Sequence, residues 1–85
     1  MPTISTFYGI IISMWFNEHN PPHIHAEYGE YEAAFDFNGN IIEGEFPPKK
    51  AKMVSVWIDI HIEELEANWK LARSQRDLFR IEPLK

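Results

Sequence analysis

The sequence predicts a single α+β domain over residues 1–85: a four-stranded antiparallel meander followed by one long helix packed on its apolar face, with a short extended C-terminal tail. Two observations carry this prediction. In residues 1–48, apolar and polar side chains alternate between turn signals, whereas in the second half apolar residues recur at three- and four-residue steps. Strands that precede a helix, rather than alternating with helices, are typical of an antiparallel sheet covered on one face. A chain of 85 residues has the length of one domain.

The strands are predicted from four apolar or alternating runs, at residues 4–16, 23–28, 31–37 and 41–46. Pro21 and Pro22 lie in the loop between the first two runs, because proline cannot donate to a sheet ladder. Gly29-Glu30 supplies the glycine that a type II′ turn needs at its first central position. Asn38-Gly39 is a strong signal for a two-residue type I′ turn. These turns complete a meander of antiparallel strands.

The helix is predicted over residues 49–74, because apolar side chains and His61 follow one stripe along it. A second pattern in this segment is typical of a strand, because every other residue is β-branched: Val54, Val56, Ile58, Ile60 and Ile62. The length of the segment and the acidic run at residues 63–67 favour the helix. We expect residues 78–84 to form the extended tail.

The two predicted turns fix which side chains share a face of the sheet. The first turn pairs Glu27 with Glu32, and the second pairs Phe35 with Ile42. Like charges directly opposite each other are unfavourable, so the Glu27–Glu32 pair indicates either a register error or a site for a cation. The apolar face, which we expect the helix to cover, collects Ile24, Ala26, Tyr28, Tyr31, Ala33, Phe35, Phe37, Ile42, Gly44 and Phe46.

The polar face holds the main candidate site. The register places His23 and His25 two residues apart on one strand, with Asp36 opposite His23. Two imidazoles and a carboxylate form a ligand set for a divalent transition metal. The same grouping suits proton transfer, because imidazole titrates near neutral pH and a carboxylate can orient it. A third interpretation is a polar sheet surface that faces solvent or a partner, which is the most common role of such a motif.

Two further histidines and a basic ridge are weaker candidates. His61 lies on the apolar stripe of the helix, where a buried, hydrogen-bonded histidine is more common than a metal ligand. It joins the metal site only if the helix reaches the polar face. His19 lies in the loop and becomes a ligand only if that loop closes over the pair. Lys70, Arg73 and Arg76 form a short basic ridge that suits an acidic partner or a phosphate backbone, although a solvated helix face is more common.

Charge is divided unevenly along the chain. Residues 1–48 contain seven Asp or Glu and no Lys or Arg, whereas residues 49–85 contain six Asp or Glu and all eight Lys or Arg, so the net charge of −5 divides into −7 and +2. The acidic half should repel nucleic acid and attract a cation or a basic partner. The absence of cysteine excludes disulfides and thiolate metal sites. The apolar run at residues 8–16 is too short to span a bilayer and lacks a basic flank, so we expect a cytoplasmic protein.

A combination of motifs covers nearly the whole chain: Met1–Ser5, Pro21–His25 with Glu27-Tyr28-Gly29, Glu43–Pro47, the helix positions Trp57, His61, Glu64-Leu65 and Asn68-Trp69, and Ile81–Leu84. This combination resembles the bacterial family called domain of unknown function 4160. The resemblance marks His23, His25, His61 and Trp69, and it implies no mechanism. Members are small and often lie beside another small protein in bacterial genomes. That arrangement implies a two-protein module of the toxin–antitoxin kind, with a basic neighbour-encoded protein as the partner.

Two functions are therefore alternatives. The first is a protein-interaction component of a two-gene module, toxin–antitoxin-like or regulatory, and the charge division and small size favour it. The second is a metal- or histidine-dependent enzyme, a hydrolase or nuclease, that uses His23, His25 and a nearby carboxylate. The sequence leaves open whether the protein is an enzyme.

Overall fold

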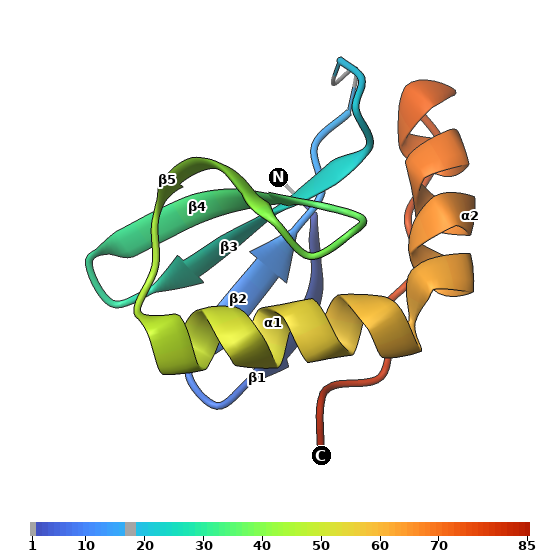
Figure 1. The fold of residues 1–85 in the computed structure, drawn as a ribbon. Helices are drawn as coiled ribbons and strands as arrows, with labels where there is room; N and C mark the ends of the chain where they lie inside the picture. Colours follow the sequence, from blue (N-terminus) through green and yellow to red (C-terminus); the bar gives the residue numbers. More distant parts are fainter. Residues whose placement is uncertain (1, 17–18) are drawn as a thin grey trace.

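The computed structural model describes residues 2–16 and 19–85, and it corrects the predicted fold class. One five-stranded antiparallel sheet, in the order β1-β2-β3-β4-β5, is followed by two helices (Figure 1). The prediction of four strands and one long helix was wrong on both counts. The elements are β1 Thr3–Phe7, β2 Ile10–Ser13, β3 His23–Tyr28, β4 Tyr31–Asp36, β5 Ile41–Glu45, α1 Pro48–Ile60 and α2 Ile62–Arg73.

The predicted first strand is a hairpin of two strands. Tyr8 and Gly9 form its turn with φ angles of 50° and 80°. Positive φ at both central residues is the geometry of a type I′ turn, which matches the twist of the flanking strands. Tyrosine rarely adopts positive φ, so the turn lacks the Asn-Gly or Asp-Gly signature by which such turns are predicted.

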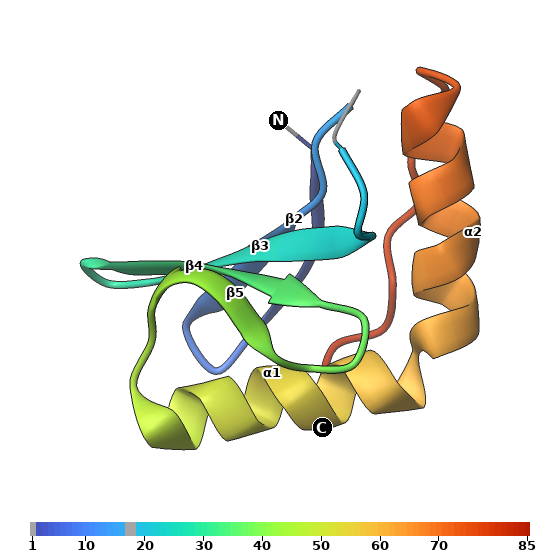
Figure 2. The same cartoon turned by 45° about the horizontal axis from the view of Figure 1, so that its top comes forward.

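The predicted helix is divided at His61, which ends α1 and precedes α2. The backbone of His61 has φ −111° and ψ 27°, outside the helical range. Its N–H still donates to the Trp57 carbonyl at 3.0 Å, and its carbonyl accepts from Leu65 N–H at 2.9 Å. The helical hydrogen-bond pattern therefore continues across a sharp change of direction, so that α1 lies across one face of the sheet and α2 stands beside its end (Figures 1 and 2).

Helix α1 forms despite the strand-like alternation over residues 54–62. Its buried side chains are Val54, Trp57 and Ile58, which lie three and one residues apart on one helical face. Val56 and Ile60, two other positions of the strand-like alternation, are 40% and 59% exposed. The alternation was thus incidental, and the three- and four-residue spacing decided the structure, as predicted.

The register between β3 and β4 confirms the prediction at every position, from His23 opposite Asp36 to Tyr28 opposite Tyr31. The turn between them contains Gly29 at φ 58°. A positive φ at this position is what the predicted type II′ turn requires. Both histidines therefore point to the same side of the sheet, away from Ile24 and Phe35 in the core.

The connection between β4 and β5 differs from the predicted two-residue turn. Phe37 to Asn40 form a longer loop, because Asp36 N–H donates to the Asn40 carbonyl at 2.9 Å. Phe35 consequently faces Ile41 rather than Ile42, and a bulge between Ala34 and Phe35 leaves Ile42 as an extra residue. The predicted pairing of Ala33 with Gly44 is confirmed beyond the bulge.

The core lies between α1 and the inner face of the sheet. Phe35, Ile24 and Trp57 have no exposed surface, and Phe7 packs on Trp57 with ring centroids 5.4 Å apart. Three residues expected on the core face are exposed: Tyr31 and Ile42, each 45% exposed, and Gly44. Ile42 is the bulged residue, and Tyr31 lies at the hairpin tip beyond the reach of the helix. Neither helix in the described part of the chain has the length and apolar character needed to cross a membrane.

The segment after α2 forms neither helix nor strand. It returns between α2 and the sheet (Figure 2), where Ile81 is buried and its N–H donates to the Ile4 carbonyl at 2.8 Å. The Asn68 side chain is wholly buried and holds this tail. Its Nδ2 donates to the Phe79 carbonyl at 2.8 Å, and its Oδ1 accepts from Phe79 N–H at 3.1 Å. Both hydrogen-bonding groups of the buried amide are thus used.

Candidate functional site

The outer face of the sheet lies on the side away from α1 (Figure 2), and the register places the polar side chains of the meander there. Cross-strand pairs share a face, so the register defines this surface. The outer face comprises Ile11, Ser13, His23, His25, Glu27, Glu32, Ala34, Asp36, Glu43 and Glu45. It includes both histidines of the predicted site and the predicted like-charge pair.

An acidic row crosses three strands of the outer face. Glu27 lies opposite Glu32, and Glu32 lies opposite Glu45 on β5. Ile11 extends the row onto β2 and is 41% exposed. None of the three carboxylates has an ion-pair partner within residues 2–16 and 19–85. The like-charge pair predicted from the sequence is therefore real, and the sheet register extends it to a third carboxylate.

A second row lies beside the first and contains His25. It runs from Ser13 on β2 through His25 and Ala34 to Glu43 on β5. The Ser13 hydroxyl is buried and has no hydrogen-bond partner in the described part of the chain. Trp15, just after β2, meets the His25 ring edge-on with centroids 6.0 Å apart. Sequence reasoning missed Ser13 and Trp15, because it placed both within a single long strand.

His23 connects this surface to α2. Its ring lies 5.1 Å from the His25 ring and 5.4 Å from the Trp69 ring, measured between centroids. His23 Nδ1 lies 2.8 Å from the Pro21 carbonyl oxygen. Because a carbonyl only accepts hydrogen bonds, Nδ1 carries a proton, and the basic nitrogen of the neutral ring is Nε2. The contact thus fixes both the tautomer and the ring orientation.

Asp36 lies opposite His23 as predicted, but its carboxylate is engaged elsewhere. Its Oδ1 accepts hydrogen bonds from the backbone N–H groups of Asn38 and Asn40, each at 2.9 Å. Asp36 therefore holds the loop before β5. The described residues contain no group of three His, Cys, Asp or Glu side chains arranged to hold a metal ion. Metal binding by His23 and His25 stays a prediction.

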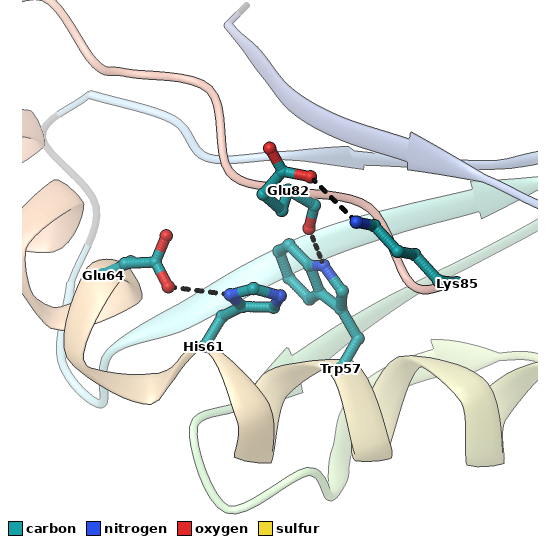
Figure 3. Close-up of polar contacts among 5 residues, drawn as sticks. All are labelled: Trp57, His61, Glu64, Glu82 and Lys85. Carbon is teal, nitrogen blue, oxygen red and sulfur yellow. Dashed lines mark hydrogen bonds and ion pairs between the residues drawn. The ribbon is translucent and has the colours of Figure 1, made fainter.

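His61 lies at the junction of α1 and α2, with no described contact to His23 or His25. Figure 3 shows its Nδ1 paired with Glu64 Oε1 at 2.7 Å, and its ring lies 5.6 Å from that of Trp57. The side chain is only 14% exposed. The Trp57 indole N–H in turn donates to the backbone carbonyl of Glu82 in the tail, at 2.8 Å. These contacts give His61 the surroundings of a structural histidine that joins helix and tail.

His19 is the remaining histidine, and it borders the same hollow of the outer face as His23 and His25. Residues 17 and 18 of its predicted loop lie outside the described residues. The basic ridge is separate from this surface. Lys70 and Arg73 lie in the last turn of α2, and Arg76 follows it; all three are exposed. Their predicted partner contact is not tested by the structure.

The small side chain of Ala34 in the second row leaves a groove on the outer face. Two adjoining hollows meet over Ala34, and both are bordered by His25 and Glu43. Glu32 borders one hollow, and His23 borders the other. We call this the Ala34 groove. Its walls combine imidazole rings on one side with carboxylates on the other.

Fold and surface together define a small α+β protein whose sheet is covered on one face and acidic on the other. The chain belongs to the family described as domain of unknown function DUF4160, whose model matches residues 9–70. The match confirms the resemblance and spans β2 to most of α2, including the whole outer face. No curated protein and no solved structure matches the chain.

Proposed function

We propose that this protein is an interaction component that binds a basic partner protein through its outer face. The observation that carries the proposal is the acidic row, in which Glu27, Glu32 and Glu45 lie directly opposite one another without an ion pair in the described part of the chain. Like charges in this position cost stability. A partner that places Lys or Arg side chains over the row relieves the repulsion and gains charge-assisted hydrogen bonds.

Two further features support a protein as the partner. Ile11, at one end of the acidic row, is 41% exposed, so the acidic surface also offers apolar contact area. Interfaces commonly combine apolar contacts with a polar rim. Strand β5 is an edge strand of five exposed residues, and its outward backbone groups can pair with an added strand. A basic protein therefore fits this side of the molecule better than nucleic acid, which the carboxylates repel.

The family resemblance suggests where the partner is encoded. Members of the family often lie beside a second small gene, so we propose the product of that neighbouring gene as the basic partner. The pair then forms a two-gene module, toxin–antitoxin-like or regulatory. The acidic row is the feature of this chain that suits such a basic partner.

Co-expression of the two gene products tests the proposal. We expect a complex at micromolar concentration and low salt, and we expect Glu32→Lys to weaken it by more than about tenfold. Glu66→Lys is the matched control, because it makes the same charge change at an exposed position of α2. Absence of a complex with the wild-type protein, or equal losses in the two variants, contradicts the proposal.

A second candidate function uses the histidine pair. The Pro21 carbonyl orients the His23 ring through Nδ1, and such orientation is usual for metal-bound and proton-transferring histidines. This candidate predicts that the purified protein takes up about one divalent transition metal ion per chain, in a metal- or histidine-dependent hydrolase or nuclease. Metal titration of the wild type, His23→Ala and His25→Ala tests whether the histidine pair binds a metal. If the wild type takes up no metal, the metal-dependent form of this candidate is wrong.

A further inference from the structure

We infer that the Ala34 groove receives an arginine side chain of the partner. This inference rests on the proposed function and adds the chemical identity of the group that is bound. The inference concerns the side chain bound in one groove of the outer face, whereas the proposed function concerns the partner protein that binds the acidic row.

The shape of the groove follows from the order of side chains in the second row. Ala34 lies between His25 on β3 and Glu43 on β5. Neighbouring strands are about 4.8 Å apart, so the backbones of the two walls are separated by roughly 10 Å. Among the described residues, the side chain between them on β4 is the methyl group of Ala34, which is 6% exposed. The remaining width suits one flat group inserted between an aromatic ring and a carboxylate.

The two walls have complementary chemistry toward a planar cation. The imidazoles of His23 and His25 lie together, with ring centroids 5.1 Å apart, and form an aromatic wall. Glu43 forms the opposite wall, and Glu32 borders the same space. Neither carboxylate has an ion pair among the residues that the structure describes. Guanidinium stacks on aromatic faces and binds carboxylates through two parallel hydrogen bonds, so arginine uses both walls at once.

Alternative occupants use less of the groove. A metal ion requires several convergent donors, and no such group of three is present in the described chain. A lysine ammonium is a compact point charge that does not stack. Three other hollows are bordered by a cation: Lys85 beside His61, Lys52 beside Asp59 and Lys70 beside Trp69. Among the described residues, no Lys or Arg borders the Ala34 groove.

A titration with Nα-acetyl-arginine amide tests this inference without the partner. We expect amide chemical shifts of Ala34, Glu43 and Gly44 to change, with a dissociation constant on the order of millimolar, as for a single anchoring side chain. Nα-acetyl-lysine amide should bind at least about threefold more weakly, because it loses stacking and the second hydrogen bond. Equal binding of the two amides, or the absence of shifts at Ala34, overturns the inference.

Variants locate the binding. Glu43→Gln should weaken arginine binding by about fivefold, since it removes the charge of one wall. Glu45→Gln is the matched control: it removes a charge from the same strand but outside the groove, and should leave binding within about twofold. Ala34→Leu should abolish binding by filling the floor. Equal losses in Glu43→Gln and Glu45→Gln indicate a general electrostatic attraction and overturn the inference, even if Ala34→Leu fails to fold.

The partner complex separates this inference from the proposed function. If the neighbouring gene product binds wild type and a folded Ala34→Leu variant equally, the proposed function stands and the arginine groove is wrong. If no complex forms with the wild type, the proposed function fails, and with it the arginine groove as a partner site. A loss of the complex in Glu43→Gln that exceeds a smaller loss in Glu45→Gln, which lies in the acidic row, supports both.

Discussion

The two faces of the sheet are built from the same strands, but they differ in how the rest of the chain contacts them. The chain buries the apolar side chains of the inner face, whereas it forms no ion pairs with the carboxylates of the acidic row in its described part. On the inner face, Ile24 and Phe35 belong with Trp57 of α1 to one buried core and have no exposed surface. On the outer face, Glu27 and Glu32 oppose each other without an ion pair in the described residues. The inner face is covered by α1 of the same chain (Figure 2). The outer face is the one that we propose a basic partner covers.

The energies of the two faces explain how the sheet tolerates the acidic row. Full burial of one large apolar side chain contributes about 1.5–3 kcal/mol, whereas a pair of opposed like charges costs roughly 0.2–1 kcal/mol. The inner face contains many such side chains, and the acidic row contains two such pairs. The apolar core therefore determines the register, and the carboxylates are held in opposition by it.

The largest predicted effect concerns the inner face. Trp57→Ala should lower the free energy of unfolding by about 3–5 kcal/mol, because it leaves a cavity under the sheet and removes the hydrogen bond to Glu82. Urea unfolding measures this change. Ile60→Ala on the same helix is the control, since Ile60 is 59% exposed, and it should cost less than about 1 kcal/mol. Similar losses in both variants would mean that α1 does not cover the sheet as described.

A smaller effect is expected at the buried amide that holds the tail. Asn68→Ala should cost about 1–3 kcal/mol, because the Phe79 carbonyl and N–H lose their partners. Hydrogen exchange at Phe79 should accelerate more than exchange in β3. Unchanged protection at Phe79 would contradict this account. The variant sharpens the comparison: Asn68 is polar and fully partnered, whereas the outer carboxylates are polar without ion pairs in the described chain.

The part of the fold that was predicted correctly depended on local signals. Gly29 identified the β3–β4 turn, and the register of both histidines followed from it. The turn at Tyr8 was missed because tyrosine gives no signal for positive φ. The break at His61 was missed because no glycine or proline marks it and the apolar spacing continues across it. Packing of α2 on the tail and sheet determines that break, and such long-range contacts leave no local pattern.

The candidate site was predicted in part for the same reason. The alternation of β3 placed His23 and His25 together, but the loop after β4 decided the role of Asp36. Its carboxylate holds that loop, which sequence spacing alone did not reveal. The longer loop shifts the register by one residue, and the bulge at Ile42 shifts it back. The predicted face of Glu43 was therefore correct although the predicted turn was wrong.

The smallest predicted effect concerns the acidic row. Glu32→Gln removes both like-charge pairs and should raise the free energy of unfolding by about 0.5–1 kcal/mol at low salt. The gain should shrink in about 1 M salt, where charges are screened beyond about 3 Å. Glu30→Gln, at the exposed hairpin tip, is the control and should change stability less. A loss of stability in Glu32→Gln would show that the carboxylate makes a favourable contact and that the row is not repulsive.

Glu32→Gln also gives the most direct test of the central claim, which is that the acidic row is completed by a basic partner. Its affinity for the neighbouring gene product should be measured by calorimetry beside its stability in urea. We predict opposite changes: a more stable protein that binds the partner about fivefold more weakly. Unchanged or tighter binding by this more stable variant would contradict the claim.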